Sequence, residues 1–195
     1  MKTTETSLLA ICAFALIARA EPYLSPSDLS RERILPNSAS PNGQLCFIEG
    51  FNGPTTATAI VLASTDLRRV LADASLATLY STDKPYKGRI TILWSPDSIR
   101  VATHDSINKH SKLTILRSEG DSFTTVPLPD LLQAACQRWG VSREAVTSSG
   151  QRPANWTAAD TLTVEVSAKL KAGNQRTTTL QLNVPKDGAA TIQSK

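Results

Sequence analysis

The chain has 195 residues, of which 41% are hydrophobic and 5% aromatic, and it carries a formal net charge of +4. This length suits one domain with its own core and is short for two. The lysines and arginines are scattered without a basic run and aromatic residues are few, which argues against a nucleic-acid partner.

Residues 1–20 have the pattern of a secretory signal peptide. Lys2 lies in a short polar start, Ser7–Ala18 is an apolar run, and Ala18-Arg19-Ala20 supplies small residues for cleavage before Glu21. A membrane anchor would need about 20 apolar residues. A lipid-anchor cysteine would follow the apolar run, whereas Cys12 lies inside it. We expect an exported protein, secreted or periplasmic, without a membrane span after cleavage.

Two further regions follow the signal peptide. Four prolines among serines and asparagines predict an extended lead-in over residues 21–43. From residue 44 to 195 the pattern changes to a single β-rich domain. Short apolar or alternating runs predict strands over 44–51, 56–63, 68–72, 76–80, 89–94, around 101–103 and over 112–116.

The only two histidines, His104 and His110, lie close together with Asp105 in a polar segment. Strands ending near Thr103 and beginning near Lys112 would make this segment a long hairpin loop, and long loops are where functional sites tend to lie. His104, Asp105 and His110 are therefore a candidate functional loop, able in principle to hold a metal or to supply a base. The competing interpretation is a solvated hairpin tip, since the spacing matches no ligand motif.

A helical insertion is expected near residues 130–148. Asp130 is an N-cap candidate and Gly140 lies where a helix would end, while Leu132, Cys136 and Trp139 share one face. A second, shorter helix is expected after it, up to about Thr147.

The C-terminal part predicts a two-stranded hairpin. Apolar residues alternate with polar ones from Leu162 to Leu170 and again from Leu180 to Val184, with a turn at 172–174 between the two runs. This alternation indicates one buried and one solvated face.

Two cysteines remain after cleavage, Cys46 and Cys136. An even number in an oxidising compartment predicts a disulfide between them. The alternative is two separate buried thiols, because free cysteine is among the most buried residue types.

Three turns look alike, each with Ser or Thr shortly before an Asp: Asp66, Asp97 and Asp160. We expect the three carboxylates to be turn formers, with antiparallel strands on either side. The segment Trp94-Ser95-Pro96-Asp97-Ser98, followed by Val101-Ala102, resembles the turn of TolB-like β-propeller blades. The resemblance implies four-stranded blade-like meanders, although three units fall short of a complete propeller.

The predicted fold is therefore mainly β, with antiparallel blade-like meanders in an open sheet or sandwich and the helical insertion at one edge. Trp94 and Trp156 are expected in the core. Asn155 begins a formal glycosylation sequon, which its place before a turn explains equally well.

No nucleophile motif, zinc motif or phosphate-binding glycine loop is present, so no cofactor or metal is expected. The leading hypothesis is an exported, non-catalytic β-rich protein that binds a partner protein in the periplasm or outside the cell. The alternative is an exported hydrolase with a site built from His104, Asp105 and His110.

Overall fold

The computed structural model describes residues 33–51, 57–66, 70–73, 90–107 and 110–193. Over these residues the protein is mainly β, as the sequence predicts: it forms three four-stranded antiparallel sheets and one short α-helix, without a closed barrel. In each sheet consecutive strands are neighbours, so that each is a simple meander.

The three sheets follow one another along the chain. Sheet A holds β1 (Arg33–Ile34), β2 (Leu45–Phe51), β3 (Ala57–Ser64) and β4 (Val70–Asp73). Sheet B holds β5 (Ile90–Trp94), β6 (Arg100–Ile107), β7 (His110–Glu119) and β8 (Ser122–Thr125). Sheet C holds β9 (Val146–Trp156), β10 (Thr161–Leu170), β11 (Gln175–Asn183) and β12 (Thr191–Ile192).

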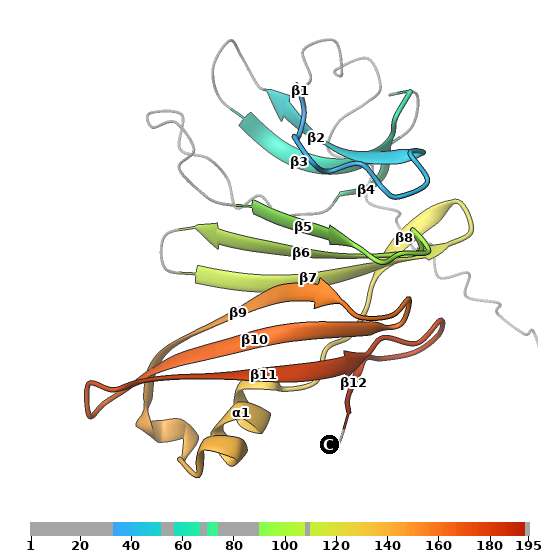
Figure 1. The fold of residues 1–195 in the computed structure, drawn as a ribbon. Coiled ribbons are helices and arrows are strands. Elements are labelled where there is room, and N and C mark those ends of the chain that lie inside the picture. Colours follow the sequence, from blue (N-terminus) through green and yellow to red (C-terminus); the bar gives the residue numbers. More distant parts are fainter. Residues whose placement is uncertain (1–32, 52–56, 67–69, 74–89, 108–109, 194–195) are drawn as a thin grey trace, which may run out of the picture.

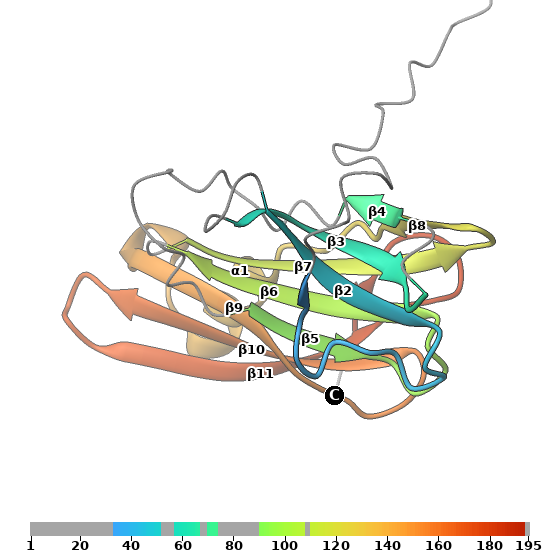
Figure 2. The same ribbon diagram turned by 90° about the horizontal axis from the view of Figure 1, so that it is seen from above.

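The sheets are stacked in chain order, with sheet B in the middle (Figure 1). Seen from above, β2 and β3 lie over the strands of sheet B (Figure 2). Two hydrophobic clusters hold the layers together. The smaller joins sheets A and B through the buried residues Phe47, Ile60, Leu62, Val101 and Leu116. The larger joins sheet B, the helix and sheet C.

Sheet B is buried on both faces, and β6 shows why. Val101 belongs to the cluster shared with sheet A, whereas Ala102, one residue later, belongs to the cluster shared with sheet C. Successive residues of a strand point to opposite faces. Because both kinds of position are apolar and fully buried, β6 runs through the centre of the stack.

The helical insertion lies between β8 and β9. Helix α1 spans Leu131–Trp139, with the Asp130 carboxylate accepting from the Gln133 amide at 2.9 Å and Gly140 ending it at φ 66°. Its residues Leu132 and Cys136 are buried in the larger cluster, against sheet C. The expected second helix is a three-residue 3₁₀ turn, Arg143–Ala145, because β9 already begins at Val146.

Sheet C has one apolar and one polar face, as its sequence alternation predicts. The residues Leu162, Val164 and Val166 are fully buried in the larger cluster. Residues between them, such as Thr163 and Glu165, are only half-buried and lie on the opposite face of β10. Among the described residues, no further sheet packs on this polar face.

Two sequence expectations concern the N-terminal half. Residues 21–43 were expected to be an extended lead-in, yet from Arg33 onward this segment belongs to sheet A, and Ser38 and Ser40 are buried. The strand expected over 76–80 lies outside the described residues, as does the signal segment 1–20. Within the described ranges, no helix has the length and apolar character needed to cross a membrane.

Candidate functional site

The segment His104–His110, expected to be a long loop, is strand over most of its length. Strand β6 continues to Ile107 and β7 begins at His110, so that these two residues face each other across the pair. Asp105 lies opposite Lys112 in the same register. The polar residues of this segment pair across the strands despite their weak β-propensity.

His104 is the one member of the candidate loop whose side chain the structure describes. It is 8% exposed, in the part of β6 that lies opposite Leu113. Burial, and secondarily the charge of Arg152 on β9, lower the pKa of its imidazole. The side chains of Asp105 and His110 lie outside the described residues, so a convergence of the three is an untested prediction.

A polar network instead connects the turns between the first two strands of sheets A and B. In sheet B, the Ser95 hydroxyl donates to Asp97 at 2.5 Å and accepts from the Arg100 amide at 2.9 Å. The Ile99 amide donates to Asp97 at 3.1 Å. Burial opposes ionisation of Asp97, but these hydrogen bonds and the charge of Arg100 outweigh it and hold its pKa below the usual value.

The same contacts recur in sheet A, at a turn that the sequence comparison missed. The Ser40 hydroxyl donates to Asn42 at 2.7 Å and accepts from the Leu45 amide at 3.0 Å, and the Gln44 amide donates to Asn42 at 3.1 Å. Gly43, at φ 70°, occupies the place of Ser98, at φ 60°. The segment Ser-Pro-Asn-Gly in sheet A is therefore the structural equivalent of Ser-Pro-Asp-Ser in sheet B.

This equivalence corrects the expectation that Asp66, Asp97 and Asp160 occupy matching turns. By position only Asp97 and Asp160 match, since each lies between the first and second strands of its sheet, whereas Asp66 lies between the third and fourth. By contact it is Asp66 that matches Asp97, because the Ser64 hydroxyl donates to Asp66 at 2.5 Å. The strands on either side of all three turns pair antiparallel, as expected. Asp160 accepts from the Thr161 hydroxyl at 3.1 Å, a different contact from that of Asp97.

The two tryptophans link neighbouring sheets in the same way. Trp94, directly before Ser95, donates its indole N–H to the Ser38 carbonyl in sheet A at 2.9 Å. Trp156, directly before Thr157, donates to the Leu93 carbonyl in sheet B at 2.9 Å. Each acceptor lies two residues before the turn serine of the preceding sheet. Both tryptophans also pack, half-buried, against the hydrophobic clusters, as core residues would.

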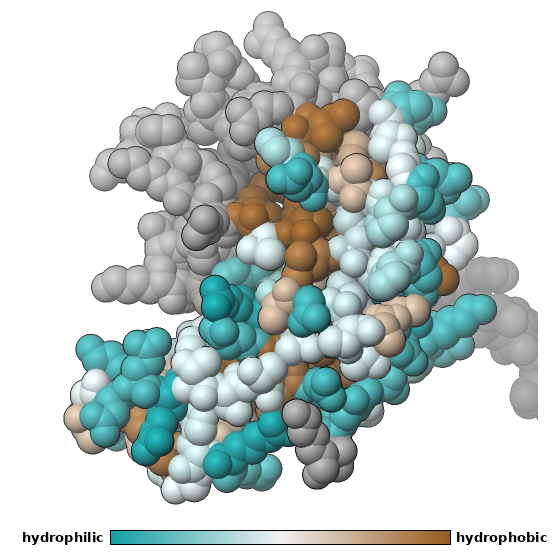
Figure 3. Space-filling model, in the orientation of Figure 1, coloured by the Kyte–Doolittle hydropathy of each residue, from teal (hydrophilic) through white to brown (hydrophobic). Residues whose placement is uncertain are grey.

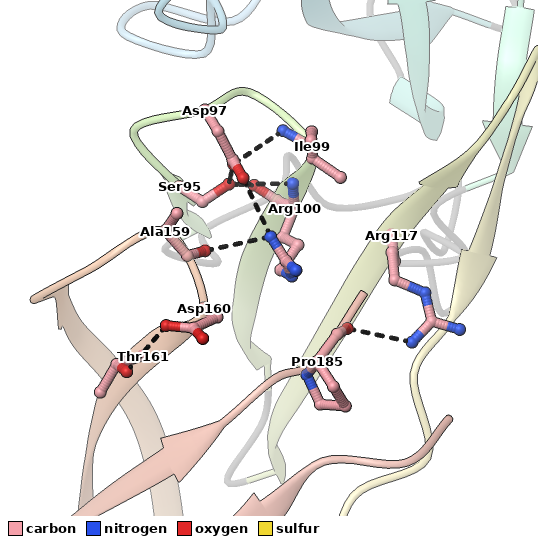
Figure 4. A network of polar contacts seen from close by, with 9 residues as sticks. All are labelled: Ser95, Asp97, Ile99, Arg100, Arg117, Ala159, Asp160, Thr161 and Pro185. Carbon is pink, nitrogen blue, oxygen red and sulfur yellow. Dashed lines mark hydrogen bonds and ion pairs between the residues drawn. The ribbon is translucent and has the colours of Figure 1, made fainter. Parts of the chain in front are cut away.

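Two arginines of sheet B reach the loops of sheet C. Arg100 and Arg117 lie opposite each other on β6 and β7 and are 5% and 7% exposed. Arg100 donates to Asp97 at 3.0 Å and to the Ala159 carbonyl at 3.2 Å. Arg117 donates to the Gly188 carbonyl at 2.8 Å. A longer hydrogen bond, of 3.4 Å, joins Arg117 to the Pro185 carbonyl (Figure 4).

This network can fix the sheets relative to one another, and its chemistry does not resemble a catalytic site. The lowered pKa of Asp97 keeps its carboxylate ionised near neutral pH, so this group is not poised to exchange a proton there. The arginines' known partners are one carboxylate each and backbone carbonyls. Among the described residues no group of three or more His, Cys, Asp and Glu side chains is placed to hold a metal ion.

The predicted disulfide between Cys46 and Cys136 is wrong. Both cysteines are buried, and they form no disulfide with each other. Cys46 lies on β2 of sheet A and Cys136 on α1 beside sheet C, with sheet B between these layers. An even number of cysteines allows all of them to pair, but a disulfide also requires two cysteines to lie close together. The distance between Cys46 and Cys136 depends on how the sheets stack, which the count does not indicate.

Asn155 of the sequon is exposed near the end of β9, with Trp156 half-buried behind it. The hydroxyl of Thr157 donates to the Thr161 carbonyl at 3.3 Å, so the threonine also serves the turn.

Searches against protein-family models, curated proteins and solved structures each return no match for this chain.

Proposed function

We propose that this chain is an exported, non-catalytic scaffold of TolB-like blades that binds a partner protein in the periplasm or outside the cell. The observation that carries the proposal is how the polar groups between the sheets are used. The Asp97 carboxylate and the Arg100 and Arg117 guanidiniums are engaged in contacts that join turns and loops, whereas one face of sheet C is polar and partly exposed.

The blade interpretation is supported by contacts that repeat from sheet to sheet. The turn around Ser40 and the turn around Ser95 have the same set of hydrogen bonds, and Trp94 and Trp156 make the same link to the sheet before. The Asn42 amide also donates to the Ser98 hydroxyl at 3.1 Å, so that equivalent turns touch. Repeated contacts of this kind are expected where like units stack.

Export is supported by the sequence pattern of residues 1–20. If it is correct, mass spectrometry of the protein recovered from the medium or the periplasm gives a mature N-terminus at Glu21. Retention of Met1 in the recovered protein would contradict cleavage and favour an anchor.

Partner binding is tested by affinity capture from the exported fraction with the tagged mature chain as bait. The expected result is a specific protein that is retained in stoichiometric amount and whose complex survives gel filtration. A matched bait with the same tag, the Ser95→Ala variant, controls for loosened packing that exposes apolar surface. Capture of the same proteins by an unrelated β-rich bait, or capture of none, would contradict the proposal.

A further inference from the structure

One sheet edge is largely uncovered within the part of the chain that the structure describes. Strand β12 has two residues and pairs with β11 only at Leu182 and Asn183, continued by the Gln193 amide bonding to the Gln181 carbonyl at 2.9 Å. No described strand pairs with β11 over residues 175–180 on that side. An edge of this kind presents backbone groups that can accept another strand.

The direction of the backbone groups along β11 follows from two contacts in its C-terminal half. The carbonyls of Gln181 and Thr179 point outward, since they accept from Gln193 and from the Arg138 side chain, the latter at 2.8 Å. In an antiparallel strand every second residue directs both of its backbone groups to the same side. Thr177 and Gln175 therefore also direct their N–H and C=O groups to the outer edge.

The edge is flanked by positive charge. Lys169, Lys171 and Arg176 are exposed around the β10–β11 turn, and Arg138 reaches the same edge from α1. Between Glu165 and Asp187 the chain has no acidic residue. Glu144, near Lys171, offsets part of this charge. In Figure 3 the visible surface over sheet C is mostly hydrophilic, whereas hydrophobic colour concentrates over sheets A and B.

We propose that the edge of β11 over Gln175–Thr179 binds an extended, acidic segment of the partner protein as an added antiparallel strand. The added strand would continue the line of β12, exchange backbone hydrogen bonds with Thr177, and place its carboxylates near Lys171 and Arg176. Recognition by strand addition takes affinity from main-chain hydrogen bonds and specificity from the flanking side chains. This inference rests on the proposed function and names the surface through which it acts.

The test uses a labelled, end-capped heptapeptide in which glutamate alternates with threonine and valine, measured by fluorescence anisotropy with the mature chain. Thr177→Pro removes the outward N–H, which an edge strand tolerates because that N–H faces solvent. Its matched control, Thr177→Val, keeps both backbone groups. The Lys171→Glu/Arg176→Glu variant reverses the charge that flanks the edge. Its control, Lys186→Glu, reverses one exposed charge at the opposite end of the sheet.

The expected result is that Thr177→Pro weakens binding about three- to tenfold, as the loss of a backbone hydrogen bond does. The double charge reversal should weaken it further at low salt, while Thr177→Val and Lys186→Glu leave it unchanged. A peptide with lysine in place of glutamate, or one N-methylated on the amides that face β11, should not bind. Circular dichroism and thermal melting show whether each variant is folded. If Thr177→Pro does not fold, the Lys171→Glu/Arg176→Glu variant still tests the edge.

Failure of the wild-type chain to bind the acidic peptide, or equal binding by the folded edge and charge variants, would overturn the proposal. The affinity capture separates this outcome from failure of the proposed function. If the wild type and Thr177→Pro capture a partner equally well, the partner binds elsewhere on the protein and the proposed edge site is refuted. Peptide binding without any captured partner supports the edge and contradicts the partner-binding function.

Discussion

Removal of the Ser95 hydroxyl tests the repeated turn most directly. Ser95 is fully buried, and its oxygen accepts from the Arg100 amide at 2.9 Å while its proton goes to Asp97 at 2.5 Å. The Ser95→Ala change leaves the buried Arg100 amide without its Ser95 acceptor and removes one of the three donors to the Asp97 carboxylate. A buried group left unsatisfied costs about 1–3 kcal/mol, and bonds to charged groups lie at the upper end.

The Ser40→Ala change supplies a matched comparison. Ser40 makes the same two bonds, but its acceptor is the neutral amide of Asn42, so its loss should cost less than the loss of Ser95. Ser149, exposed on β9, is the control, since exposed substitutions usually stay within about 0.5 kcal/mol. We expect the order Ser95, then Ser40, then Ser149 in loss of unfolding free energy.

The assay is urea unfolding followed by circular dichroism, with melting as a second measurement. A loss of 1–3 kcal/mol would lower Tm by roughly 2–10 °C for a chain of this size. The slope of unfolding free energy against urea should not change, because the surface exposed on unfolding is the same. A Ser95→Ala variant within about 0.5 kcal/mol of the wild type would refute the network as a source of stability.

Three other changes have expected outcomes. Asp97→Ala should lower the unfolding free energy by about 1–3 kcal/mol in urea titrations, since the buried Arg100 loses its carboxylate partner, without abolishing capture of the partner protein. His104, whose pKa is lowered by burial and then by Arg152, favours its neutral form in the folded protein. The contribution of neutral His104 to the unfolding free energy should therefore be fully present above the usual histidine pKa of about 6.5 and be lost as the pH falls below it. His104→Gln should make the unfolding free energy depend less steeply on pH in this range. Because Cys46 and Cys136 are not bridged, dithiothreitol should leave the urea midpoint of the mature protein unchanged; a lower midpoint would contradict the structure.

The sequence predicts elements whose signal is local. The ends of α1 follow from Asp130 and Gly140, because a cap is a contact within one turn of the helix. The β10–β11 hairpin follows from strict alternation, since a one-residue slip would move every apolar side chain to the solvated face.

Properties that depend on stacking could not be predicted in this way. The turn of sheet A that matches the Asp97 turn in position has Asn42 in place of the aspartate. A search for Asp found Asp66 instead, which accepts from a serine two residues earlier as Asp97 does but lies between the third and fourth strands. The burial of Arg100 and Arg117 depends on carbonyls 59 to 71 residues away along the chain. A charged residue at a strand position normally indicates a solvated face, and only the loops of the next sheet reverse that expectation.

The same comparison explains why the described sheets form a stack with a polar end. Sheet B needs apolar residues at both kinds of position in β6, because sheets cover both of its faces. Sheet C needs apolar residues only at the positions that face sheet B. The positions on its opposite face carry Thr163 and the ion pair of Arg152 with Glu165 at 2.9 Å. A further sheet packed on that face would have to desolvate this pair, and the attraction between buried charges often fails to repay that cost. Contacts with sheet C are therefore expected to be polar or to run along its edge, where backbone hydrogen bonds can form without burying the face.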